Sequence, residues 1–113
     1  MAHFMFRWRL RDEAVSGLVR NPQDRTAPAR QMIASFGGRM LSFFYTFGEF
    51  DGFAICEMPD EHAAVALAMA SRATQRFEDF QMLTLFTPEE AERMMQRAHT
   101  ADPSYVPPGN YVP

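Results

Sequence analysis

The sequence contains no lysine, because all 11 of its basic residues are arginine. Schiff-base catalysis and the Walker-type phosphate loop both depend on the ammonium group of a lysine side chain. The absence of lysine therefore excludes both kinds of chemistry.

Cysteine is almost absent too, with Cys56 as the single thiol. It cannot form an intramolecular disulfide, and within an apolar run it acts as a small hydrophobic side chain. The histidines, His3, His62 and His99, lack the spacing of metal ligands, and the glycines form no dinucleotide fingerprint. We expect a reducing compartment, no metal and no cofactor.

Positive charge and long apolar runs are scarce as well. The formal net charge is -3, whereas phosphate binding requires clustered cations, so we expect no nucleic-acid partner. Arg7 and Arg9 interrupt the only apolar stretch at the N-terminus, which argues against a secretion signal. No segment approaches the ~20 apolar residues of a membrane span. We expect a soluble cytoplasmic protein that does not associate with membranes.

Apolar residues are plentiful, and their spacing predicts the secondary structure. Residues 3–10 alternate between apolar and polar, which is typical of a strand, and Asp60 begins a long alanine-rich helix. Thr87 and Glu90 form a capping box at the start of the last helix. In chain order we expect strand 3–10, a short helix from residue 12, a helix over 26–36, strands 39–47 and 53–58, a helix to about 73, strand 77–86 and a helix from 88.

This order of elements predicts an α+β fold of the ferredoxin-like split βαβ type, a four-stranded antiparallel sheet with helices on one face. The other sheet face would then be uncovered, although it also carries large apolar side chains. We assign to it Met5, Phe43, Tyr45, Phe53, Ile55 and Leu83. Because such a patch exceeds what soluble monomers expose, we expect a homo-oligomer, a dimer closed through its sheets into an α/β barrel.

The chain divides into a domain over residues 1–100 and a Pro-rich tail over residues 101–113. The tail cannot continue a helix. Either it is an extended end, or its Tyr105, Val106 and Tyr111 dock on a neighbouring subunit.

Several short motifs occur together: "NPQDR" before the second helix, "FGGR" after it, "GEFDG" at the hairpin, an acid at the end of the third strand and "PDEH" at the next helix. In this combination the chain resembles the GYD-domain family over roughly residues 3–98. The resemblance implies a ferredoxin-like domain of the dimeric α/β-barrel type and no particular reaction. The family pattern falls on Arg25, Gly37, Gly48, Asp51, Glu57 and Asp60, and Phe50 stands where the name-giving tyrosine would be.

Glu57 is the best candidate for a catalytic group, because a carboxylate inside an apolar strand is costly unless it is paired or reaches water. Small Ala54 and Cys56 should lie opposite bulky Phe4, Phe6 and Trp8, which leaves Glu57 on the face of Arg7 and Arg9. A bidentate Arg7–Glu57 pair is one interpretation, and an acid or base in a pocket is the other.

Arg7, Arg25, Asp51 and Glu57 are the candidate ligand-binding residues. Arg25 either forms a solvated ion pair, with Asp24 or another carboxylate, or faces a cleft and binds an anionic molecule. Asp51 either bonds to local amides of the hairpin turn, where Gly48 and Gly52 supply unusual backbone angles, or contributes to a site.

Three functions remain open. The first is a homo-oligomeric small-molecule-binding or accessory domain, with an aromatic pocket between sheet and helices or at the subunit barrel. The second is a cofactor-free enzyme of the small oxygenase, isomerase or lyase type that uses Glu57 with Arg7, Arg9 or Arg25. The third is a structural assembly component clamped by its tail.

Overall fold

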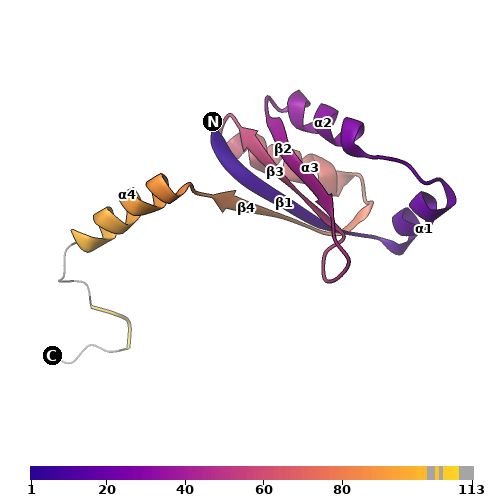
Figure 1. Cartoon of the computed structure of the whole chain (residues 1–113). Helices are drawn as coiled ribbons and strands as arrows, with labels where there is room; N and C mark the ends of the chain where they lie inside the picture. The colour runs from indigo at the N-terminus through magenta and orange to yellow at the C-terminus, as the bar shows by residue number, and fades with distance from the viewer. Residues whose placement is uncertain (102–103, 105, 110–113) are drawn as a thin grey trace.

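The computed structural model describes residues 1–101, 104 and 106–109 of the chain, and Tyr105 and Tyr111 of the proposed docking tail lie outside the described residues. The elements are β1 (Ala2–Leu10), α1 (Asp12–Arg20), α2 (Thr26–Ser35), β2 (Arg39–Tyr45), β3 (Gly52–Met58), α3 (Glu61–Ala73), β4 (Phe77–Leu85) and α4 (Pro88–His99) (Figure 1).

The four strands form one sheet in the order β2-β3-β1-β4, and every neighbouring pair is antiparallel. The strands β1 and β3 are neighbours at the centre, while β2 and β4 form the two edges. This arrangement is the ferredoxin-like split βαβ fold, and the predicted fold class is confirmed.

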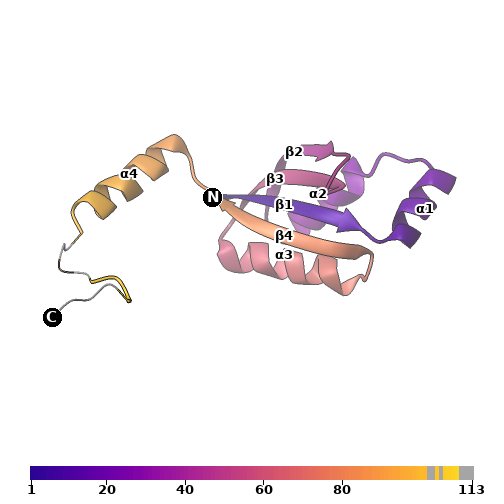
Figure 2. The same cartoon turned by 90° about the horizontal axis from the view of Figure 1, so that it is seen from below.

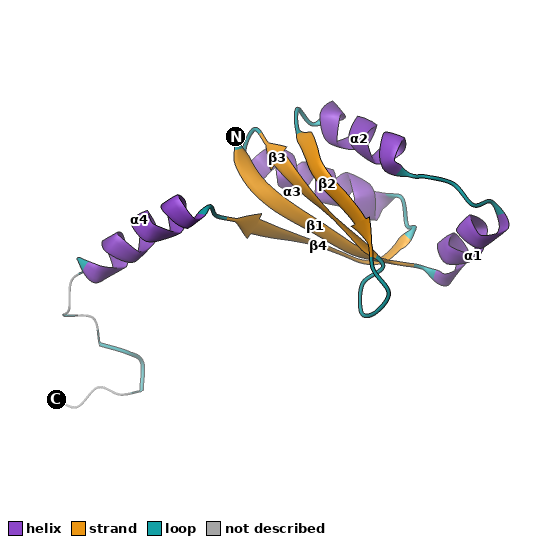
Figure 3. Ribbon diagram, viewed as in Figure 1, coloured by secondary structure: helices purple, strands orange, loops and turns teal. Residues whose placement is uncertain are grey.

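One face of the sheet is covered by helices and the other is not. The helix α3 packs against β4, β1 and β3, and α2 packs against β2 (Figures 2 and 3). The core lies between these layers, where Phe4, Phe6, Cys56 and Met58 are at most 2% exposed. The helix α1 lies at one end of the sheet, and α4 extends from the other end (Figure 1).

Side-chain volume sets the register of the two central strands. In β1 and β3, Phe4 lies opposite Cys56, Phe6 opposite Ala54, and Trp8 opposite Gly52. Each large ring therefore faces a small residue on the covered face. The predicted pairing of bulky with small residues is confirmed.

A β-bulge corrects the assignment of faces in β2. The register with β3 shifts between Met40 and Ser42, so an extra residue enters the strand and the side chains beyond it change face. Phe43 and Tyr45 consequently lie on the covered face, and Phe44 replaces them on the uncovered one, stacked on Phe53 with ring centroids 5.5 Å apart. A strict two-residue alternation does not anticipate this change.

Helix capping follows the sequence at two of the predicted positions. The Asp60 carboxylate accepts a hydrogen bond from the amide of Ala63 at 2.8 Å. Thr87 and Glu90 form the complete capping box at the start of α4. No helix among the described residues is long and apolar enough to cross a membrane.

Candidate functional site

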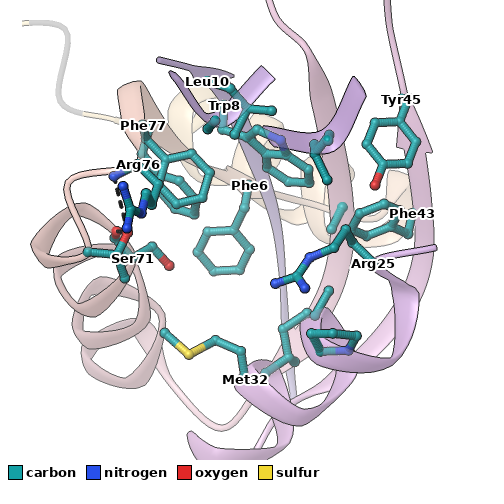
Figure 4. A pocket seen from close by; sticks show the side chains of 18 of the residues that line it. Phe6, Trp8, Leu10, Arg25, Met32, Phe43, Tyr45, Ser71, Arg76 and Phe77 are labelled. Carbon is teal, nitrogen blue, oxygen red and sulfur yellow. Dashed lines mark hydrogen bonds between the residues drawn. The ribbon is translucent and has the colours of Figure 1, made fainter. Parts of the chain in front are cut away.

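A cavity of about 670 Å³ opens between the covered sheet face and the helices α1, α2 and α3 (Figure 4). Its floor is formed by the sheet, where Phe6, Trp8 and Ala54 line it. The helix α1 contributes Ala14 and Leu18 to the lining. The cavity exists because α1 lies at the end of the sheet instead of packing closely on it.

Aromatic rings form much of the cavity wall. Trp8 stacks on Phe80 with centroids 6.2 Å apart and planes 14° apart, and it meets Phe43 at 5.5 Å. Phe77 packs edge-on against Phe80 at 5.1 Å. The indole ring requires Gly52 beneath it, since a Cβ there would lie 2.7 Å from the ring. Rings held in this way present flat apolar surface to the cavity.

Arg25 lines the cavity from the connection between α1 and α2, and Figure 4 shows its guanidinium projecting into the cavity. Its Nη1 donates a hydrogen bond to the Gln23 side-chain oxygen at 2.9 Å. Among the residues that the structure describes, no carboxylate lies within ion-pair distance of Arg25. The expected ion pair with Asp24 or another acid is therefore wrong.

Asp24 has another role. Its carboxylate accepts bonds from the hydroxyl and the amide of Thr26, and these bonds lower its pKa, the hydroxyl more than the amide. The acid thus stabilises the start of α2 while Arg25 points elsewhere.

Arg76, Glu13 and Tyr45 bring the other ionisable groups to the cavity lining. Arg76 belongs to the connection between α3 and β4, and Figure 4 draws it across the cavity from Arg25. Ser71 of α3, a buried residue with a hydroxyl group, also lines the cavity. The cavity therefore has apolar walls with a few polar groups.

Glu57 lies on the uncovered face of the sheet, away from the cavity. Its carboxylate accepts from the Arg39 guanidinium at 2.9 Å and lies 3.8 Å from His3. The register explains both contacts, because Arg39 and His3 are the cross-strand neighbours of Glu57 on either side. The carboxylate is paired and partly exposed.

The predicted Arg7–Glu57 pair is wrong. Arg7 lies opposite Phe53, four residues along β3 from Glu57, which is about 13 Å at the rise of a strand. Its Nε donates to the Gln81 side chain at 2.9 Å, and its guanidinium lies 4.4 Å from the centre of the Phe50 ring. Phe50 thus holds Arg7 by a cation–π contact that needs no hydroxyl.

Asp51 joins the hairpin to the first strand, and its partner is not a local amide of the turn. Its Oδ2 accepts from the Leu10 amide at 2.7 Å, and its own amide donates to the Trp8 carbonyl at 2.8 Å. Gly48 has no positive φ, and a Cβ added to it would meet no atom within 4 Å, so the turn does not require glycine there.

Cys56 is fully buried on the covered face. Burial disfavours the thiolate and raises the pKa of this thiol to about 12. The side chain is therefore a neutral packing group at neutral pH, and not a nucleophile.

Of the four candidate ligand-binding residues, the structure brings only Arg25 to the cavity. Sequence reasoning expected an aromatic pocket between sheet and helices or at the subunit barrel, but it named neither Tyr45 nor Arg76 as part of it. The sequence contained two signals for this site. One was the row of large aromatic residues on one face of β1, and the other was the polar segment that connects α1 and α2. Among the described residues, no group of three His, Cys, Asp or Glu side chains is placed to hold a metal ion.

The fold and the cavity together define an α+β, ferredoxin-like domain with an aromatic pocket beneath its helices. The family model of the GYD domain matches residues 4–95, and the chain belongs to the GYD domain family. A search of curated proteins found no match.

Proposed function

We propose that this protein is a homo-oligomeric small-molecule-binding domain whose ligand occupies the aromatic cavity. The observation that carries the proposal is the cavity itself, because about 670 Å³ is far larger than the gaps of a packed interior. Ligand pockets in proteins span about 300–1,000 Å³ and combine apolar walls with few polar groups. The cavity has both properties.

The lone tryptophan provides a direct test, since Trp8 is the only one in the sequence and lines the cavity. Decanol, a neutral apolar probe without an aromatic chromophore, should bind and change the intensity or wavelength of Trp8 emission. Ala14→Phe should fill the cavity from α1 and weaken this response. Ala98→Phe on α4, outside the cavity lining, is the matched control. The proposal would be refuted if decanol gave no response in the wild-type protein and calorimetry detected no binding of decanol, of 2-naphthoate or of its methyl ester.

The assembly is expected to be a homodimer formed through the uncovered sheet face. Met5, Phe53, Ile55 and Leu83 are only partly buried there, and Phe44 is 56% exposed. Two identical copies packed face to face would remove this apolar surface from water. The dimeric α/β barrel implied by the GYD resemblance has the same arrangement.

The position of α4 also supports association. This helix has no buried residue, and Met94 and Met95 are 41% and 68% exposed. The protein measures 65 × 31 × 23 Å with a radius of gyration of 18.8 Å, against about 13 Å for a compact chain of this length. A helix that protrudes with exposed methionines is suited to packing on a second subunit.

Phe53→Asp tests the dimer, because it would place an unpaired charge in an apolar interface. We expect a halved mass by light scattering, with an unchanged circular dichroism spectrum. Val19→Asp is the control, since Val19 is 73% exposed on α1, away from the sheet face. An unchanged mass for a folded Phe53→Asp protein would refute association through this face.

The enzyme and assembly alternatives receive less support. A catalytic Glu57 would need access to a bound substrate, but it is paired with Arg39 on the face opposite the cavity. Tail-driven assembly relies on Tyr105 and Tyr111, which lie outside the described residues. Small-molecule binding is the function that the observed cavity supports.

A further inference from the structure

The charges that line the cavity are unequal. Its lining includes two arginines, Arg25 and Arg76, and only one acid, Glu13. None of the three takes part in an ion pair in the described part of the chain. The cavity therefore carries a net positive charge beside its apolar walls.

Arg25 has the chemistry of an anion-binding group. Arg25 is exposed at the mouth of the cavity, and its hydrogen-bond partner is the neutral side-chain amide of Gln23, so the guanidinium is available to an anion that enters. Its planar fork of donors matches the two oxygens of a carboxylate. A ligand carboxylate would supply the counter-charge that the protein does not.

The aromatic part of the lining has the chemistry of an aromatic-binding surface. Trp8, Phe77, Phe80 and Phe43 offer ring faces and edges, which favour offset-stacked or edge-on contacts with another ring. A flexible aliphatic chain would lose more conformational entropy in this space than a rigid planar molecule.

We propose that the ligand is an aromatic carboxylate, with its ring system against Trp8 and Phe80 and its carboxylate paired with Arg25. This inference rests on the proposed binding function and adds the chemical class of the ligand. The cavity is large enough for a molecule with a single ring or with two fused rings. Arg25 would favour ligands that carry a carboxylate, and the aromatic wall would favour ligands that contain an aromatic ring.

The test compares 2-naphthoate with its neutral methyl ester by isothermal titration calorimetry. The two probes share a ring system and differ in charge. We expect the wild-type protein to bind the acid about ten-fold or more tightly than the ester, as a charge-assisted hydrogen bond would give. Arg25→Gln should reduce acid affinity to about that of the ester and leave ester affinity unchanged. Arg30→Gln, an exposed arginine of α2 outside the lining, should change neither.

The outcomes separate this inference from the proposed function. If acid and ester bind the wild type equally well, or the ester binds more tightly, the ligand class is wrong and cavity binding stands. If Arg25→Gln leaves a real acid preference intact, the assignment of Arg25 is wrong. If neither probe nor decanol binds, both the ligand class and the binding function are refuted. The wild-type comparison does not depend on the folding of any variant.

Discussion

Cys56 and Glu57 are adjacent in β3 but lie in opposite environments. Cys56 points into the core and is 0% exposed, whereas Glu57 points to the uncovered face and pairs with Arg39, whose side chain is 68% exposed. On the covered face a titratable group is held neutral, and on the other face a charge is tolerated because water and a partner are near.

The two faces of the sheet therefore differ in what their side chains contribute to the protein. The covered face contains the core and the cavity, so its residues determine stability and would determine the proposed ligand binding. The uncovered face keeps apolar side chains partly exposed between polar ones, which suits an interface more than a core. Substitutions on the two faces should therefore differ in the size of their effect on stability and in the property that they affect.

The largest difference is expected between two phenylalanines. Phe4 is 1% exposed on the covered face, and Phe4→Ala should lower the free energy of unfolding by about 3–5 kcal/mol through lost burial and a residual cavity. Phe53→Ala on the uncovered face should cost clearly less in dilute protein, where the face meets water. Urea denaturation of both variants checks this. Equal losses would mean that the second face is as tightly packed as the first.

Cys56 should make stability fall at high pH. Burial raises the pKa of its thiol from an ordinary 9.0 to about 12, so the folded chain keeps the proton where the unfolded chain releases it. This contribution is complete below the unfolded pKa, decreases as pH rises above about 9 and is lost by about 12. Between about pH 8 and about pH 10 the wild type should lose about 1 kcal/mol more stability than Cys56→Ala. Parallel pH profiles for the two proteins would contradict this expectation.

Glu57→Gln should have the smallest effect. The Arg39–Glu57 pair is open to solvent on the Arg39 side, and exposed ion pairs contribute about 0–1 kcal/mol. We expect a change in the free energy of unfolding of about 0.5 kcal/mol or less, measured by urea denaturation in dilute protein. Glu78→Gln on β4 is a control at an exposed strand position. A loss of several kcal/mol would mean that the pair behaves as a buried one.

Much of the fold was predictable because it depends on local patterns. The alternation over residues 3–10 identified β1, and the capping residues Asp60 and Thr87 located α3 and α4. The pairing of large with small side chains fixed the β1–β3 register, since two bulky rows cannot face each other across one rung.

The errors in the prediction arose where several elements meet. The Arg7–Glu57 pair was placed on the correct face but at the wrong rung, and β2 was overlooked as the source of Arg39. The bulge in β2 moved Phe43 and Tyr45 to the covered face. The sheet face on which a side chain lies can be read from the pattern of its own strand. Which residue it contacts depends on the register of the neighbouring strands.

The sequence by itself determined the elements, their order, the covered face of the central strands and the absence of lysine chemistry, because each depends on residue type and spacing along the chain. Only the tertiary structure decided that α1 leaves a cavity, that Arg25 points into it without an acid partner among the described residues, and that α4 extends from the sheet. These features depend on how elements distant in sequence fill space together, and the volume left between them is not encoded in any one segment.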